Sequence, residues 1–397
     1  MHQSFISYTN QHEYAVVIGK NTIHTIYERY YMFKNVTIAS LILIGSYSIS
    51  THTTSVQSIE ISDEQKLSQK LDEYISTSTA QDRFSCSVLI AKKDTILLNK
   101  GYGCANYEFN IPNDHTTRFS IGSNTKIFTA VAIMLLQEQD LLNVHDPVAK
   151  HISGFPQTIT LHHLLTHTSG VPNYYKQWDS ICEYNDLNEI INVIKNWELE
   201  FSPGSQYCYS NTGYLILAHI IEKLSGASLE TFLSKHILEP LHMHDTGSIC
   251  NGHMILRKAS GYFKRDAILY NASTIMSPIT LLGSGDLYSS TTDMHTFIQA
   301  LFTGAIISKD NLATTLSCHV MMKDSLDRAH GYGWFIDKKQ NKRIVEYSGW
   351  IRGFVSKVMH FVDDNITIIV LTNREDPDSF FNFCDELATI VCCSDIQ

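Results

Sequence analysis

An almost wholly apolar run from Ile127 to Leu136 constrains the fold of this chain more than any other stretch. Its length and lack of charge predict a helix buried on nearly all sides. Ser123, a favoured N-cap residue, stands at its head, and Lys126 follows one turn later. Residues three apart share a helix face, so a hydroxyl and an amine should lie together there. Because burying a lysine is unfavourable, this one is either paired for structural reasons or present for chemistry.

The period of the hydrophobic pattern differs between the ends of the chain and its middle. Apolar residues alternate, as in strands, over 84–91, 95–102, 331–337, 343–348, 352–362 and 365–373. Helical spacing is found over 61–74, 160–165, 186–198, 212–224, 229–237, 292–302 and 377–391, and 245–290 reads as irregular. We therefore predict an α+β fold, in which both chain ends build one antiparallel sheet and a mainly helical region, about 123–302, is inserted. A ligand would bind in the cleft between the two regions.

Composition and missing motifs exclude several classes of function. The 397 residues carry a net charge of −10 without a Lys/Arg-rich run, so nucleic acid is not an expected partner. The nine cysteines are scattered and form no CxxC pair, which predicts neither a disulfide framework nor a zinc ribbon. His163 and His167 lie one helical turn apart, but no Glu follows the first, so no metal site is predicted. Nucleotide-binding glycine motifs are also absent, and no cofactor is expected.

The N-terminal segment has the pattern of a secretory signal peptide. A short basic lead at 32–35 precedes the mostly apolar stretch 36–45, and small residues follow where a cleavage site would lie. This pattern predicts a signal peptide within 32–50 and a translation start at Met32. An uncleaved membrane anchor and a buried segment are the alternatives. The protein would then be exported to the periplasm or the extracellular space, with a membrane tether if the leader is retained.

Two further short motifs carry groups that suit acyl transfer. Tyr209-Ser210-Asn211 precedes a predicted helix, and it offers a phenol that can act as acid or base and an amide that can hold a carbonyl or the lysine amine. Tyr347-Ser348-Gly349-Trp350 ends a predicted strand, where a glycine lets a substrate approach and the strand edge can supply an oxyanion-hole N–H. Each motif alone has a structural alternative, namely a helix entry capped by Asn211 and an ordinary strand with a bend.

Taken together, these motifs resemble those of the serine β-lactamase and penicillin-binding-protein superfamily, which combine S-x-x-K, Y-x-N and a [K/H]-[S/T]-G strand. The similarity is greatest to the branch of class C β-lactamases, DD-carboxypeptidases and esterases, and it spans roughly Leu67 to Ala388. The resemblance implies a β-lactamase/transpeptidase-like fold. From this resemblance and from the Ser/Thr-rich stretch 46–58, which indicates a linker, we expect a leader and linker over 1–60, a catalytic domain over 61–391 and a tail over 392–397.

The resemblance further implies a role for each motif residue. Ser123 would attack a carbonyl and become acylated, Lys126 would accept its proton, and Tyr209 would pass a proton to the leaving group. Asn211 would bind the substrate amide. The expected protein is an exported serine hydrolase that acts through an acyl-enzyme on an amide or ester. Its substrate would be a cell-wall peptide, a β-lactam or an ester, as for DD-carboxypeptidases, β-lactamases and esterases.

On the strand side, the backbone N–H of Trp350 would complete the oxyanion hole with that of the nucleophile, and Ser348 and Gly349 would line the wall. The family has Lys or His where this chain has Tyr347, so a neutral hydroxyl replaces a cation that attracts substrate carboxylates. This departure favours esterase or broad peptidase activity over efficient β-lactam hydrolysis. It also supports an alternative, a catalytically weak penicillin-binding or sensing homologue. Arg352 is either a source of the missing charge or a solvated strand residue.

Overall fold

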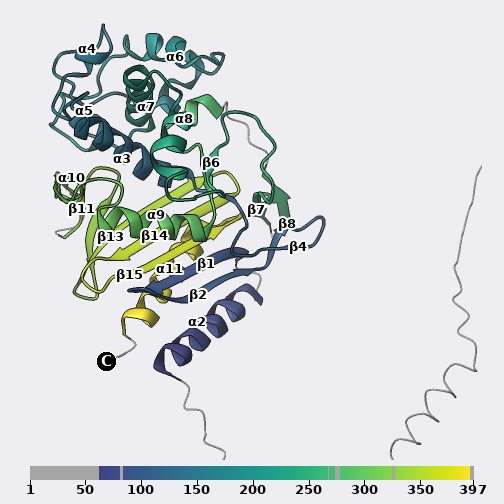
Figure 1. Cartoon of the computed structure of the whole chain (residues 1–397). Coiled ribbons are helices and arrows are strands. Elements are labelled where there is room, and N and C mark those ends of the chain that lie inside the picture. Colours follow the sequence, from purple (N-terminus) through teal and green to yellow (C-terminus); the bar gives the residue numbers. More distant parts are fainter. Residues whose placement is uncertain (1–61, 81–83, 267, 273–277, 324–326, 394–397) are drawn as a thin grey trace, which may run out of the picture. The chain divides into compact units, whose positions relative to one another are not determined.

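One large antiparallel sheet is the framework of the computed structural model, which describes residues 62–80, 84–266, 268–272, 278–323 and 327–393 (Figure 1). Its eight strands run in the order β10-β11-β12-β13-β14-β15-β1-β2. Strand β1 (Cys86–Lys92) lies between β15 (Ile366–Thr372) and β2 (Thr95–Tyr102), so the two ends of the chain meet inside the sheet. This arrangement confirms the predicted sheet built from both ends. The predicted leader lies outside the described residues.

The other strands of this sheet follow one another near the C-terminus. They are β10 (Val320–Met321), β11 (Ala329–His330), β12 (Phe335–Lys339), β13 (Lys342–Ile351) and β14 (Phe354–Phe361). Smaller sheets join β3 (Cys104–Asn106) to β4 (Ile111–Pro112), and β5 (Phe119–Ser120) through β9 (Leu287–Ser289) to β6 (Gly247–Ser248). A further sheet joins β16 (Arg374–Glu375), β7 (Tyr262–Arg265) and β8 (Ile268–Asn271).

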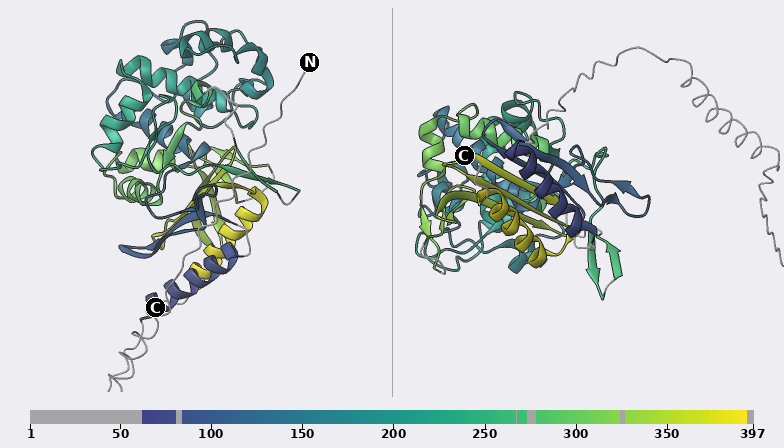
Figure 2. Two further views of the ribbon diagram at one scale, coloured as in Figure 1. Left: turned by 90° about the vertical axis from the view of Figure 1, so that its right-hand side faces the viewer. Right: turned by 90° about the horizontal axis from the view of Figure 1, so that it is seen from below.

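Alternation along the strands gives the large sheet two buried faces. On β1, Leu89 and Ala91 belong to one core, whereas Val88 and Ile90 belong to the other. The terminal helices α2 (Asp63–Ala80) and α11 (Pro377–Cys392) together cover the second face (Figure 2). Their buried residues recur every three or four positions, so each helix buries one stripe and leaves the opposite side to solvent.

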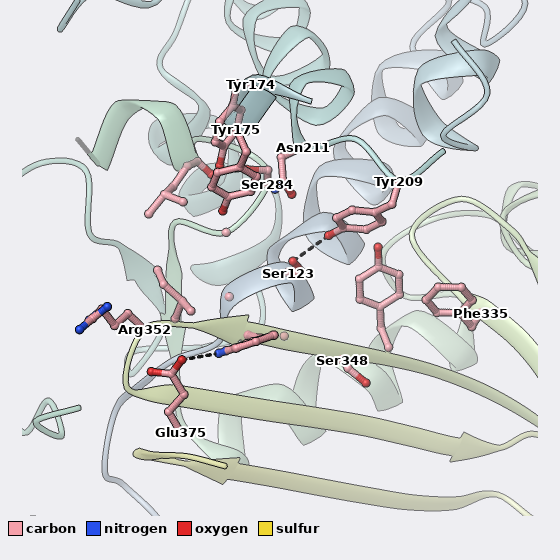
Figure 3. Close-up of a pocket in the computed structure, with 17 residues that line it drawn as sticks. Ser123, Tyr174, Tyr175, Tyr209, Asn211, Ser284, Phe335, Ser348, Arg352 and Glu375 are labelled. Carbon is pink, nitrogen blue, oxygen red and sulfur yellow. Dashed lines mark hydrogen bonds between the residues drawn. The ribbon is translucent and has the colours of Figure 1, made fainter. Parts of the chain in front are cut away.

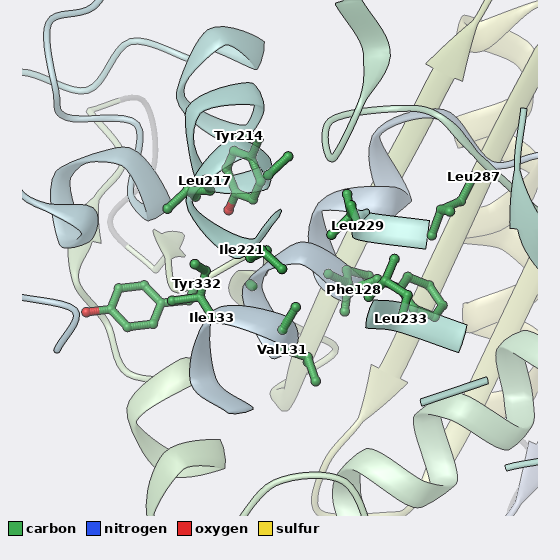
Figure 4. Packing of buried hydrophobic residues seen from close by; sticks show 14 of the residues in the cluster. Phe128, Val131, Ile133, Tyr214, Leu217, Ile221, Leu229, Leu233, Leu287 and Tyr332 are labelled. Atoms are coloured by element: carbon green, nitrogen blue, oxygen red, sulfur yellow. The ribbon is translucent and has the colours of Figure 1, made fainter. Parts of the chain in front are cut away.

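The first face of the sheet carries the helical region. Its helices are α3 (Thr125–Glu138), α4 (Val148–His151), α5 (Leu161–Leu165), α6 (Leu187–Ile194), α7 (Asn211–Ser225), α8 (Leu229–Leu233), α9 (Thr291–Thr303) and α10 (Lys309–Thr315). Phe128 of α3 stacks on Phe297 of α9 with ring centroids 4.0 Å apart. Side chains of α3, α7 and α8 meet in the same core, among them Ile133, Leu217 and Leu233 (Figure 4). Helix α3 is thus buried on nearly all sides, as its apolar run predicts.

Several boundaries differ from the sequence prediction. Helix α3 begins at Thr125, and Ser123 precedes it in the 3₁₀ turn Gly122–Asn124, so Ser123 is not the N-cap residue. The stretch 245–290 contains β6, β7, β8 and β9, although the sequence predicts it to be irregular. These strands have only two to four residues: β6 and β9 pair with each other across about 40 residues, and β7 and β8 form a short, largely exposed hairpin, so no alternating pattern marks them. Among the described residues, no helix combines the length and apolar character needed to cross a bilayer.

Candidate active site

A cavity of about 530 Å³ opens where the large sheet meets the helical region, and Ser123 lies on its wall (Figure 3). The walls come from the 3₁₀ turn before α3, the start of α7, the loop before β9, and the end of β13. Seven of the eight residues predicted for the site line this cavity: Ser123, Tyr209, Asn211, Tyr347, Ser348, Gly349 and Trp350. The eighth, Lys126, is fully buried beneath Ser123. The structure therefore brings all of them together.

The Lys126 amine has three oxygen neighbours. Its Nζ is 2.7 Å from Asn211 Oδ1 and 2.6 Å from the Ser284 carbonyl oxygen, and both of these atoms are acceptors. Ser123 Oγ lies 3.3 Å from the same nitrogen. A neutral amine has two N–H groups for the two acceptors and one lone pair that can accept the Ser123 hydroxyl. Burial lowers the pKa of Lys126 well below its usual value, which makes the amine available as a base.

A buried carboxylate opposes this shift. The Asp286 side chain accepts hydrogen bonds from Gly283 N at 2.8 Å and from Ser248 Oγ at 2.7 Å. Burial raises the pKa of Asp286 to about 6, while these hydrogen bonds favour its ionised form. Its negative charge favours the ammonium form of Lys126 and so raises the lysine pKa, although desolvation remains the larger effect. Asp286 therefore tunes the basicity of Lys126 without touching the cavity.

Tyr209 contacts Ser123 as well. Its hydroxyl donates a hydrogen bond to Ser123 Oγ across 2.8 Å (Figure 3). Burial raises the pKa of Tyr209 to about 12, so the phenol is protonated at neutral pH. The Lys126 nitrogen also lies 4.9 Å from the centre of the Tyr209 ring. The Ser123 hydroxyl therefore lies within reach of both a protonated phenol and an amine whose pKa is lowered.

His167 supports the segment that carries Tyr209. Its ring lies 4.5 Å from the Tyr209 ring, and its Nδ1 accepts a hydrogen bond from Ser210 N at 3.2 Å. Burial lowers the pKa of His167 well below its usual value, so the ring is neutral and can act as this acceptor. The residue reaches this position through a left-handed backbone conformation with φ of 59°. His167 thus acts on the fold of the site, and the described residues contain no metal-binding group of three or more ligands.

Strand β13 passes so close to the 3₁₀ turn that glycine is required on both sides. A Cβ atom at Gly349 would lie 1.9 Å from the Ile121 carbonyl oxygen. A Cβ atom at Gly122, where φ is +50°, would lie 2.9 Å from Trp350 N. The backbones around Ser123 and Trp350 therefore meet at one wall of the cavity. Two backbone N–H groups brought together in this way can bind a developing oxyanion.

Comparisons with known proteins identify the family. The β-lactamase family model matches residues 67–391 of the chain. This chain belongs to the β-lactamase family. It is 31% identical to penicillin-binding protein 4* of Bacillus subtilis (strain 168) over 318 residues, which are 75% of this chain and 70% of that protein. It is 30% identical to protein flp of Staphylococcus aureus (strain MRSA252) over 72% of this chain, but this match spans only 59% of flp.

Solved structures agree with this assignment. The penicillin-binding protein of Bacillus halodurans superimposes with a TM-score of 0.70 and 25% identity, covering 82% of this chain and 98% of that one. The match confirms the β-lactamase/transpeptidase-like fold predicted from the motifs. As a member of the β-lactamase family, the chain is a serine hydrolase of the β-lactamase/DD-peptidase type.

The Tyr347 position of this β-lactamase-family site carries no charge. Tyr347 is buried where the family pattern has Lys or His, and its ring stacks on Phe335 with centroids 5.4 Å apart. Its hydroxyl has no partner of standard hydrogen-bond geometry among the described residues, yet it lies near enough to Tyr209 to lower the pKa of that phenol. Arg352, the candidate for the missing cation, lies over the Phe263 ring at 4.7 Å. That contact holds its guanidinium on the β7 side of the cavity.

Sequence reasoning missed one charged residue of the site. Glu375 lines the cavity, where its Oε1 accepts a hydrogen bond from Trp350 Nε1 at 3.0 Å and its Oε2 accepts one from Gly353 N at 2.9 Å. No local signal marks this glutamate, because β16 is only two residues long and is fixed by parallel pairing with β7. The Ser284 carbonyl that binds Lys126 is another partner that a side-chain motif cannot reveal.

Proposed function

We propose that this member of the β-lactamase family hydrolyses an amide or ester through an acyl-enzyme on Ser123. The observation that carries the proposal is the contact of the Ser123 hydroxyl with a fully buried Lys126 whose other two neighbours are both acceptors. A serine hydroxyl is a weak nucleophile until a base removes its proton. Lys126, whose pKa is lowered by burial, would be that base.

The proposed reaction begins when Lys126 accepts the proton of Ser123 as Oγ attacks the substrate carbonyl carbon. The carbonyl oxygen becomes an oxyanion, and the backbone N–H groups of Ser123 and Trp350 stabilise it. Asn211 uses Oδ1 for the lysine amine, so its amide N–H groups remain to bind a substrate carbonyl. The bond to the leaving group then breaks, and Tyr209 donates a proton to it. Water attacks the acyl-enzyme by the same steps in reverse, which frees the acid and restores Ser123.

Tyr347 bears on the substrate class. A carboxylate beside Tyr347 would be desolvated without a cation to pair with it, which is unfavourable. We therefore propose uncharged or amine-bearing amides and esters as better substrates than β-lactams and peptide C-termini. Ser348 and Gly349 would line the strand side of the bound substrate.

The proposal is tested with purified protein, a fluorescent penicillin and a short-chain p-nitrophenyl ester. Wild type should turn over the ester, and Ser123→Ala should lose at least about 10³-fold in kcat/KM. Ser205→Ala, on an exposed turn outside the cavity, is the matched control and should behave as wild type. Equal rates for wild type and Ser123→Ala would contradict the acyl-enzyme.

A second candidate function rests on Tyr347. A family member that acylates but does not deacylate would be a penicillin-binding or sensing protein. Mass spectrometry after β-lactam exposure separates the two functions. A stable adduct on Ser123 with no product release favours sensing, and rapid release favours the hydrolase.

We also propose that the protein is exported, with leader and linker over 1–60, the catalytic domain over 61–391 and a tail over 392–397. The helical part of the domain, about 123–302, would be inserted in the sheet part. The basic lead and apolar stretch after Met32 support this proposal. N-terminal sequencing of the mature protein is the test: a start within or soon after 46–50 supports cleavage, and a retained 36–45 supports a membrane tether.

A further inference from the structure

The rim of the cavity carries a fixed negative charge. Among the described residues that line the cavity, Glu375 is the only acidic one and Arg352 is the only basic one. Lys126 is buried beneath the cavity and does not line it. Glutamate side chains in contact with water are ionised at neutral pH. Trp350 Nε1 and Gly353 N each donate to one oxygen of Glu375, which holds the carboxylate in one orientation. Each oxygen keeps a lone pair for a further donor.

No cation of the described chain neutralises Glu375. The residue takes part in no ion pair among the described residues, and its two hydrogen bonds come from neutral N–H groups. Arg352 is near in sequence, but its guanidinium lies over Phe263, and Figure 3 shows it turned away from Ser123. The carboxylate is therefore oriented but has no cation partner among the described residues, and it lies beside the exposed side chain of Trp350. An ammonium group is attracted by both of these partners.

Glu375 is placed to face the acyl portion of a bound substrate. Tyr209, which would protonate the leaving group, lies beside Tyr347, so the leaving group occupies the Tyr347 side of the cavity. The Trp350 N–H would bind the carbonyl oxygen in the middle. The acyl portion would then extend past Trp350 toward Glu375, which is hydrogen-bonded to the Trp350 indole.

We propose that Glu375 binds an ammonium group on the acyl portion of the substrate, so that the preferred substrates are amides or esters of amino acids or peptides with a free amine. This inference rests on the proposed function, because it names the substrate class of the same site. The neutral Tyr347 agrees with this inference. The Glu375 side of the site would attract a positively charged acyl portion, and the Tyr347 side has no cation to attract a carboxylate on the leaving group.

The test uses thiobenzyl esters of D- and L-alanine in three forms that share one leaving group: free amine, N-acetyl and N-succinyl. Wild type should prefer the free amine to the N-acetyl form by about tenfold or more in kcat/KM, and the N-succinyl form should be the poorest. Glu375→Gln keeps the size of the side chain but removes its charge, and it should abolish the preference for the free amine over the N-acetyl form. Arg352→Gln is the matched control and should keep the preference.

Three results would overturn the inference: no preference in wild type, a preference that survives in Glu375→Gln, or a preference for the N-succinyl form. If Glu375→Gln loses all activity because Trp350 moves, the wild-type preference is compared at low and high salt. A charge-based preference must fall as salt screens it, and an unchanged ratio would contradict the role of Glu375. Turnover of the neutral N-acetyl ester without any charge preference would leave the proposed hydrolase intact, whereas no turnover of any ester would count against the hydrolase itself.

Discussion

Lys126 is the residue whose ionisation should set the pH dependence of the reaction. The base must be neutral, so kcat/KM should rise as the pH rises through the lowered pKa of this lysine. Asp286→Asn removes the buried charge that favours the ammonium form, so the lysine pKa should fall further and the rising limb should move to lower pH. Tyr209, with its pKa raised to about 12, should add no falling limb near neutral pH.

The measurement is a pH profile of kcat/KM for wild type and for asparagine variants of two buried carboxylates. Asp293→Asn is the control, because Asp293 bonds to Thr246 and Asp245 N and does not contribute to the lysine pKa. Its rising limb should coincide with that of wild type. A limb that stays in place or moves to higher pH in Asp286→Asn would contradict the assignment of Lys126 as the base.

At the residue scale, the sequence predicted the site residues that belong to a recognisable motif. It missed those that only the tertiary fold brings to the site. Ser123, Lys126 and Tyr209 could be named in advance because their chemistry and order are distinctive, and the structure brings them within hydrogen-bond distance. Their catalytic roles remain predictions until Ser123→Ala is measured. Glu375 and Ser284 could not be named, because each reaches the site through tertiary contacts of short segments without a periodic pattern.

At the scale of elements, the approach of β13 to the 3₁₀ turn gives a steric prediction. In Gly349→Ala the new methyl group would collide with the Ile121 carbonyl and with Ser356 Oγ, 2.5 Å away, so the strand must move outward. We expect kcat/KM to fall by about 10²-fold or more, because the Trp350 N–H leaves the oxyanion hole. The free energy of unfolding should fall by about 1–3 kcal/mol.

Enzyme kinetics and urea unfolding measure the two effects of Gly349→Ala. The control is Gly252→Ala, because a methyl group added at Gly252, where φ is 68°, would have no other atom within 4 Å. That variant should lose a little stability through backbone strain and keep wild-type activity. Full activity in Gly349→Ala would show that the strand edge does not form the oxyanion hole.

Elements with a clear hydrophobic period were predicted closely, and short elements without one were not. Strand β2 matches its predicted range of 95–102, and α11 ends within one residue of the predicted 391. By contrast, the predicted start of α3 is two residues early. Ser123 has the residue type of an N-cap, but its hydroxyl accepts a hydrogen bond from Tyr209 and does not cap the helix. Strands β7 and β8 were missed because most of their side chains are exposed and do not alternate.

At the scale of the whole molecule, the two ends of the chain depend on each other. Strand β1 pairs with β15 along its whole length, so the N-terminal hairpin cannot join the sheet until the last strands have formed. The terminal helices α2 and α11 then cover the same face of the sheet and share one core. Because β13 belongs to this sheet, the wall of the active site is also a product of contacts between the two ends.

This dependence predicts that α11 is indispensable for folding. A chain that stops after Asp376 loses four large buried side chains, Phe380, Phe383, Leu387 and Val391. Each contributes about 1.5–3 kcal/mol by burial, so their sum is comparable with the total stability of about 5–15 kcal/mol of a typical domain. The shortened protein should be insoluble or unfolded by circular dichroism and should not be acylated.

A chain that stops after Cys393 keeps the whole helix and should fold and react as wild type does. A soluble chain ending at Asp376 that unfolds cooperatively would show that the sheet holds together without its second core.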